Sequence, residues 1–223
     1  MAQNLTPRLK AAASLVRGGG ILADIGTDHG YLPIYLVETG KIDKAIAADI
    51  GKMPLENARK SIEQNALSDK ISLRLSDGLR SFSPDDADEF VFAGMGGTVI
   101  VEKLVETQWI KNEKYHFVFQ PQSRAEELRQ FLFRNGFQIE EEIATHEGRR
   151  VYIAFSAFYN GKNTECSYAD CFLGKLPPTE DGKNHIKKQI SRLSDRYNSA
   201  ALSEEESKTL FETIEKLKEF TNG

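Results

Sequence analysis

The chain has 223 residues and a formal net charge of −4, and 40% of its residues are hydrophobic and 28% charged. These values predict an ordinary globular protein with one full domain and a smaller appendage, and they exclude a membrane-spanning chain because every apolar run is only strand-sized. The N-terminal residues lack the apolar core of a signal peptide, so we expect a cytoplasmic protein.

Short apolar runs alternate with helical patterns over the first 136 residues. The runs at 20–25, 44–50, 70–78, 89–97 and 115–122 predict strands, and the segments at 31–40, 53–67, 98–108 and 124–136 predict helices. Strands that alternate with helices indicate a parallel sheet covered on both faces. Residues 137–159 instead read as two strands joined through "HEGR", which predicts an antiparallel hairpin at the end of that sheet.

The last third of the chain has a different pattern. Two loop-like segments bracket the unassigned stretch "CSYADCFLG", whose two cysteines match no metal-ligand spacing, so we expect reduced thiols and no metal site. Two amphipathic helices follow, with apolar positions at Ile186, Ile190, Leu193 and Tyr197 in one and at Leu210, Ile214 and Leu217 in the other. Ser203 and Glu206 form a capping-box signature at the start of the second helix. We therefore expect an antiparallel helical pair joined at 199–203.

Each of the five parallel strands ends in polar residues or glycines. These ends carry Asp24 and Gly26, Asp49, Asp77 and Gly78, Gly94–Gly97, and Gln120–Gln122. Because the carboxyl ends of parallel strands meet at one edge of the sheet, where open α/β sheets bind ligands, we expect a small-molecule site there.

The first of these ends, "DIGTDHG" at 24–30, indicates the class of ligand. Asp49 lies 23 residues past Gly26, at the position from which a carboxylate accepts ribose hydroxyls, so an adenosine-type cofactor is predicted. A pyrophosphate would be repelled by Asp24 and by Asp28, which replaces the usual middle glycine, at a cost on the order of 1 kcal/mol each. S-adenosylmethionine carries a cationic sulfonium and ammonium instead. The turn therefore favours this cofactor over a dinucleotide.

Several of these residues have a second interpretation. Asp24 and Asp28 could cap the following helix, and Asp77 could serve a plain turn rather than contact an adenine amine. His29 fits a structural position at a helix start, and Tyr31 fits helix packing as well as stacking on a target base.

The motif "DIGTDHG" resembles motif I of class I methyltransferases, Asp/Glu-x-Gly-x-Gly-x-Gly. Together with "AADI", "SDGL", "AGMGG" and "QPQ", it resembles the bacterial TrmK family of tRNA methyltransferases over about residues 5–160. The resemblance implies methyl transfer from S-adenosylmethionine to N1 of adenine 22 in tRNA. It also implies an α/β fold: a class I methyltransferase Rossmann-like sheet with an antiparallel last strand in residues 1–160, followed by a coiled-coil-like helical hairpin in residues 161–223. The Asn/Asp-Pro-Pro-Tyr signature of N6-adenine enzymes is replaced by "AGMGG", so no catalytic asparagine is carried over.

We expect the cofactor-binding residues to be Asp24, Gly26, Thr27, His29, Gly30, Tyr31, Asp49, Ile50, Asp77 and Gly78. Adenine N1 has an in-plane lone pair and needs no general base, so catalysis should depend on positioning. We expect Asp28 to stabilise the developing positive charge, and backbone carbonyls of Gly94, Met95, Gly96 and Gly97 to accept from the amine of the flipped base.

RNA binding requires cations, and residues 182–196 contain five Lys/Arg and one Asp. We expect substrate contacts from Arg8, Gln120, Pro121, Lys183, Lys187, Lys188 and Arg192, with Lys10, Arg149 and Arg150 as further basic residues. The alternative for the C-terminal cluster is a solvated helix face. We expect a monomer with tRNA as its partner. The alternative functions are methylation of another RNA or a protein, and non-catalytic RNA binding on this fold.

Overall fold

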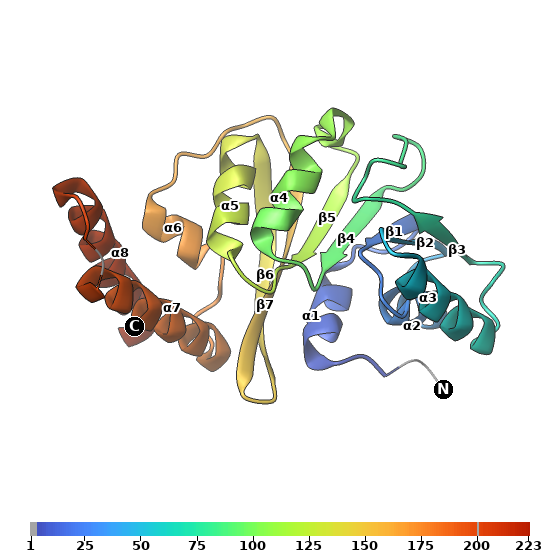
Figure 1. Ribbon diagram of the computed structural model, residues 1–223, viewed down its shortest axis with the longest axis horizontal. Helices are drawn as coiled ribbons and strands as arrows, with labels where there is room; N and C mark the ends of the chain where they lie inside the picture. The colour runs from blue at the N-terminus through green and yellow to red at the C-terminus, as the bar shows by residue number, and fades with distance from the viewer. Residues whose placement is uncertain (1–3, 200) are drawn as a thin grey trace.

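The computed structural model describes residues 4–199 and 201–223. Its centre is a seven-stranded sheet with the strand order β3-β2-β1-β4-β5-β7-β6 (Figure 1). The strands are β1 (Ile21–Ile25), β2 (Lys44–Asp49), β3 (Ile71–Leu75), β4 (Glu89–Ala93), β5 (His116–Gln120), β6 (Phe137–Glu147) and β7 (Arg150–Tyr159). Among the strands of the described residues, only β7 runs antiparallel to its neighbours, β5 and β6. The predicted parallel sheet and terminal hairpin are therefore confirmed.

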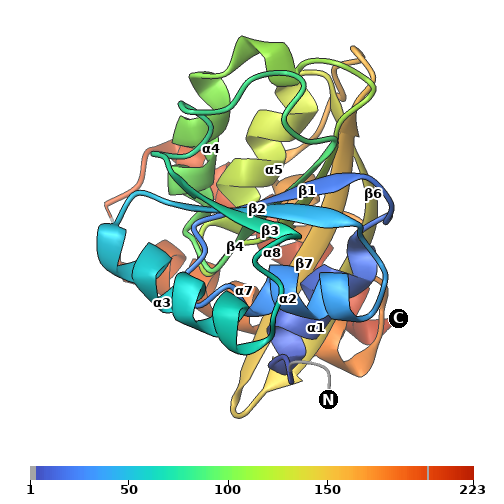
Figure 2. The same cartoon turned by 90° about the vertical axis from the view of Figure 1, so that its right-hand side faces the viewer.

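Helices cover both faces of the sheet (Figure 2). They are α1 (Pro7–Leu15), α2 (Tyr31–Glu38), α3 (Lys52–Gln64), α4 (Gly97–Val105), α5 (Ala125–Arg134), α6 (Tyr168–Leu173), α7 (Glu180–Ser199) and α8 (Glu204–Asn222), with a short 3₁₀ helix η1 at Gln108–Ile110. Alternate residues of each strand point to opposite faces. On β5, Phe117 and Phe119 therefore join the core under α4 and α5, whereas Val118 joins the core under α1 and α2.

Two helices lie where the sequence analysis assigned no element. In α1, Pro7 occupies the first turn and the alanines at 11–13 are buried, so the helix packs closely against the sheet. In α6, the side chains of Ser167 and Asp170 form a reciprocal capping box. Both helices use signals that were present in the sequence, namely an N-terminal proline and a Ser-x-x-Asp spacing.

The C-terminal helices form the expected pair, with α8 returning along α7 (Figure 1). Ser203 accepts from the Glu206 amide and Glu206 accepts from the Ser203 amide, so the predicted capping box is present. Leu193, Leu210 and Leu217 belong to the same hydrophobic core as the α4–α5 side of the sheet. Within the described residues, no helix has the length and hydrophobicity needed to cross a membrane.

Candidate cofactor and catalytic site

The turn after β1 lies where the strand order reverses, between β1 and β4. The amides of Gly26 and Thr27 both donate to the Ala48 carbonyl of β2, at 2.8 and 2.9 Å, so the turn is fixed to the neighbouring strand. Gly26 has a φ of +82°, and a side chain there would collide with the methyl group of Met95. The glycine therefore lets this turn pack against the "AGMGG" loop.

A cavity of about 360 Å³ opens between the ends of β1, β2, β3 and β4, a size within the range of small-molecule sites. Its walls include the predicted cofactor residues Gly26, Asp49, Ile50, Asp77 and Gly78, and the predicted catalytic residues Gly94 and Met95. The structure thus brings together residues from four separate strand ends, as the sequence predicted.

Three carboxylates come from the first two strands and the turn between them: Asp24 in β1, Asp28 in the turn after it, and Asp49, which ends β2 and lines the cavity. Asp24 is buried, and this burial, reinforced by the charge of Asp49, raises its pKa to about 6 although Thr27 partly opposes the shift. Burial and the nearby Asp28 likewise raise the pKa of Asp49, against the stabilising hydrogen bond from the Gly51 amide at 2.6 Å. Neighbouring carboxylate charges thus raise the pKa values of Asp24 and Asp49, so this region favours a cation.

Asp28, His29 and Tyr31 project from the start of α2 rather than into the cavity walls. Asp28 is 72% exposed, and its carboxylate lies 3.4 Å from His29 Nε2. The rings of His29 and Tyr31 stack with their centroids 5.1 Å apart. The N-cap of α2 is Gly30, which makes no side-chain capping bond, so the capping interpretation of the two aspartates does not apply to this helix.

Lys103 is a site residue that the sequence analysis missed. It lies on α4, lines the cavity, and places its Nζ 2.6 Å from Asp77 Oδ1. This hydrogen bond lowers the pKa of Asp77. Gly78 has a φ of +61°, and a side chain there would press on the aliphatic part of Lys103. No local motif marks Lys103, because its role depends on which face of α4 meets the cavity.

The "AGMGG" loop is held between β5 and α4 by backbone hydrogen bonds. The Met95 carbonyl accepts from the Gln122 amide at 2.7 Å, and the Gly96 carbonyl accepts from the Ile100 amide at 3.0 Å. Of the carbonyls proposed to meet a substrate amine, the geometry therefore favours that of Gly94. Gly97, the last glycine, packs instead against the backbone of Arg124.

Arg8 reaches this loop from α1. Its Nη1 donates to the Oε1 of the fully buried Gln120 at 3.1 Å, and its Nε lies 3.5 Å from a Glu147 carboxylate oxygen. Gln120 in turn accepts from the Gly94 amide through its main-chain carbonyl at 3.1 Å. Pro121 is also buried. The structure therefore places Arg8, Gln120 and Pro121 beside the catalytic loop.

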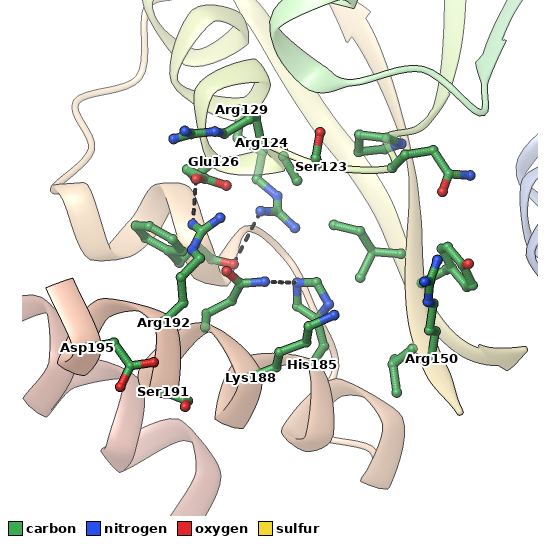
Figure 3. A pocket seen from close by; sticks show the side chains of 18 residues that line it. Ser123, Arg124, Glu126, Arg129, Arg150, His185, Lys188, Ser191, Arg192 and Asp195 are labelled. Carbon is green, nitrogen blue, oxygen red and sulfur yellow. Dashed lines mark hydrogen bonds and ion pairs between the residues drawn. The ribbon is translucent and has the colours of Figure 1, made fainter. Parts of the chain in front are cut away.

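The four predicted basic residues of the C-terminal region lie on α7, away from the cofactor cavity. Lys188 and Arg192 line a second cleft between α7 and the β5–α5 turn, whereas Lys183 and Lys187 do not (Figure 3). Arg192 is paired with Glu126, with 2.6 Å between nitrogen and oxygen. Within the described residues, His, Cys, Asp and Glu form no group that could hold a metal ion.

Comparisons with known proteins agree with this geometry. A family model described as "Methyltransferase domain" matches residues 5–155. The Bacillus subtilis tRNA (adenine(22)-N(1))-methyltransferase is 33% identical over 148 residues, which make up 66% of this chain and 62% of the relative. The chain thus aligns with less than two thirds of the length of the curated relatives it matches.

Solved structures match over almost the whole chain. Streptococcus pneumoniae Sp1610, in complex with S-adenosyl-L-methionine, is 33% identical with a TM-score of 0.82, and the match covers 96% of this chain and 98% of Sp1610. Bacillus subtilis TrmK is 27% identical with a TM-score of 0.84, covering 98% and 99%. The strand order, the cavity beside the first turn and these matches together establish that the chain belongs to the methyltransferase domain family and, within it, to the TrmK family.

Proposed function

We propose that this protein transfers a methyl group from S-adenosylmethionine to N1 of adenine 22 in tRNA. The observation that carries the proposal is the carboxylate cluster beside the cavity at the strand-order reversal. It suits a cationic cofactor and opposes a pyrophosphate. The proposal is supported by the matched relatives, which include a tRNA (adenine(22)-N(1))-methyltransferase and a structure in complex with S-adenosyl-L-methionine.

The residues of the cavity fit this cofactor. Asp49, at the end of β2, would accept from the ribose hydroxyls, Asp77 would accept from the adenine amine, and Asp24 would balance the methionine ammonium. Gly26 and Gly78 lie where a side chain would collide with Met95 and Lys103, so the two glycines let the cavity wall pack closely. The bound cofactor supplies an electrophilic methyl group on a sulfonium.

The remaining residues position the target base. Attack by the N1 lone pair forms a carbon–nitrogen bond, and the electron pair of the breaking carbon–sulfur bond returns to sulfur, so the adenine becomes cationic. Asp28, exposed in the turn between β1 and α2, would stabilise that charge, and the Gly94 carbonyl would accept from the exocyclic amine. Arg8 would hold Gln120 and the loop in place. The base must leave its stack to reach this position.

We propose a division of labour between residues 1–160, which hold the cofactor and the target base, and residues 161–223, which hold the tRNA. Lys183, Lys187 and Lys188 on α7 would supply phosphate contacts. In this proposal the protein acts as a monomer in the cytoplasm.

A methyl-transfer assay with purified protein, radiolabelled S-adenosylmethionine and tRNA transcripts tests the function. We expect label in a tRNA with adenine at position 22 and none when guanine replaces that adenine. Reverse transcription of the product should stop at position 22, since N1-methyladenine cannot pair. Label that persists in the guanine variant would contradict the assignment of the target base.

A further inference from the structure

The cleft between the catalytic core and α7 has a volume of about 540 Å³, larger than the cofactor cavity. Its walls come from the β5–α5 turn, the start of β7 and one face of α7 (Figure 3). These segments are far apart in the sequence and meet only because the C-terminal helices pack beside the β6–β7 hairpin. The cleft therefore exists only in the assembled fold.

The charge of this cleft is opposite to that of the whole chain. Five of its lining residues are Arg or Lys and two are Asp or Glu, although the chain has a net charge of −4. Among the described residues, ion pairs engage Arg124, Arg129 and Arg192 but leave Arg150 and Lys188 without a carboxylate partner. Two exposed cations from different elements, β7 and α7, therefore face the same space and can bind an anion between them.

The cleft adjoins the catalytic loop. Gln122 and Ser123 line it, and the same two residues bind the loop: the Gln122 amide donates to the Met95 carbonyl, and the Ser123 carbonyl accepts from the Gly97 amide at 2.7 Å. A single segment of two residues thus separates the cleft from the loop expected to meet the target base. An RNA strand whose target base reaches this loop can therefore extend across the Gln122–Ser123 segment to the cleft.

Uncharged polar groups complete the cleft. The Gln189 Oε1 atom is buried and has no hydrogen-bond partner among the described residues, while its Nε2 lies 3.5 Å from His185 Nε2. Burial, together with the nearby charge of Arg129, lowers the pKa of His185 to about 3, so this imidazole is neutral. Gln189 and His185 line the same cleft as Arg150 and Lys188, so uncharged polar side chains lie among its cations.

We infer that this cleft binds the sugar–phosphate backbone of a nucleotide adjacent to the target adenine, with Arg150 and Lys188 on the phosphate. The inference rests on the proposed function, because it requires an RNA substrate whose target base enters the cofactor site. It adds a second RNA contact site, distinct from the cofactor cavity and assembled by both parts of the chain.

The test uses the double variant Arg150→Gln/Lys188→Gln and measures tRNA binding by fluorescence anisotropy at several salt concentrations. We expect about tenfold weaker binding near 0.1 M salt, and a slope of log K against log salt smaller by about 1 to 2, since two phosphate contacts are lost. The dissociation constant for S-adenosylhomocysteine should stay unchanged. Lys60→Gln, an exposed lysine on the distant α3, is the matched control and should leave both quantities unchanged.

A substrate change locates the contact. One tRNA carries an uncharged methylphosphonate at the linkage on one side of adenine 22. The native protein should bind this tRNA more weakly than it binds unmodified tRNA. The double variant should bind the two tRNAs equally well, because it has already lost the contact to that phosphate. Additive losses at both flanking linkages, or a double variant that behaves like Lys60→Gln, would overturn the cleft assignment. If the native protein labels tRNA in the methyl-transfer assay described above, the proposed function stands even when the cleft assignment fails. If it labels no tRNA, the proposed function itself fails.

Discussion

The raised pKa of Asp24 predicts how cofactor binding depends on pH. Asp24 is buried and its pKa lies at about 6, above the ordinary value of 3.8. A cofactor ammonium beside it favours the ionised carboxylate, so below pH 6 a proton has to leave before binding. The affinity for S-adenosylhomocysteine should therefore fall by about tenfold for each pH unit below 6 and level off above 7.

The same pKa shift predicts that the unliganded protein becomes less stable as the pH rises, whereas its cofactor affinity increases. Because the pKa of Asp24 is raised in the folded state, its contribution favours folding below pH 3.8 and is lost as the pH rises through 6. A shift of about two pKa units corresponds to about 3 kcal/mol at neutral pH. The variant Asp24→Asn should therefore raise the free energy of unfolding of the unliganded protein by up to about 3 kcal/mol, while it weakens cofactor binding.

Isothermal titration calorimetry with S-adenosylhomocysteine between pH 5 and pH 8 provides the measurement. Asp24→Asn should abolish the pH step, whereas the control Asp49→Asn should weaken binding but keep the step, moved to slightly lower pH because Asp49 raises the pKa of Asp24. A constant dissociation constant for the native protein over this range would refute the reasoning. A step that survives in Asp24→Asn would assign the titration to another group.

Three further predictions concern other parts of the molecule. Asp28→Ala should lower kcat by tenfold or more, a change on the order of 1.4 kcal/mol in the activation barrier, and alter the S-adenosylhomocysteine dissociation constant by less than about threefold. Steady-state kinetics and calorimetry measure the two quantities. Equal losses in kcat and in cofactor affinity would assign Asp28 to the cofactor. Gly78→Ala should cost about 1–2 kcal/mol in urea unfolding because of its φ of +61°, and should weaken cofactor binding by displacing Lys103. Ser203→Ala should lower the unfolding free energy by about 1 kcal/mol through loss of the capping box and leave kcat unchanged. An unfolding free energy equal to that of the native protein would show that this cap does not contribute to stability.

The central sheet was predictable because its parallel strands are short and largely apolar, and each is followed by glycines or polar residues. Buried parallel strands leave this mark directly in the sequence. Helix α1 was missed because three consecutive alanines show no amphipathic period, although their small size is what allows close packing on the sheet. Helix α6 was missed because it is too short for a periodic pattern, and only its Ser167–Asp170 spacing marks it.

The candidate site likewise contains residues that the sequence could place and residues that it could not. Asp24, Asp49 and Gly26 could be placed because each lies at or directly after the carboxyl end of a strand, so the chain order fixes their position. Lys103 could not, since it reaches the site from a helix whose rotation is set by packing, whereas Arg8 was expected only as a substrate contact and its bond to Gln120 was not foreseen. The second cleft was beyond sequence reasoning because no single segment contains enough of its walls.

The hydrophobic core continues from the sheet into the C-terminal helices without a break. Leu210, Ile214 and Leu217 on α8 share one cluster with Phe117 and Phe119 on β5. Swinging the helical pair outward would strip cover from these side chains, at about 25 cal/mol for each Å² exposed. The spacing between α7 and the carboxylate cluster is therefore set by folding, before any ligand arrives. The proposed RNA contacts on α7 and the proposed cofactor site are therefore held at a fixed separation, and the proposal requires an RNA whose own shape spans that distance.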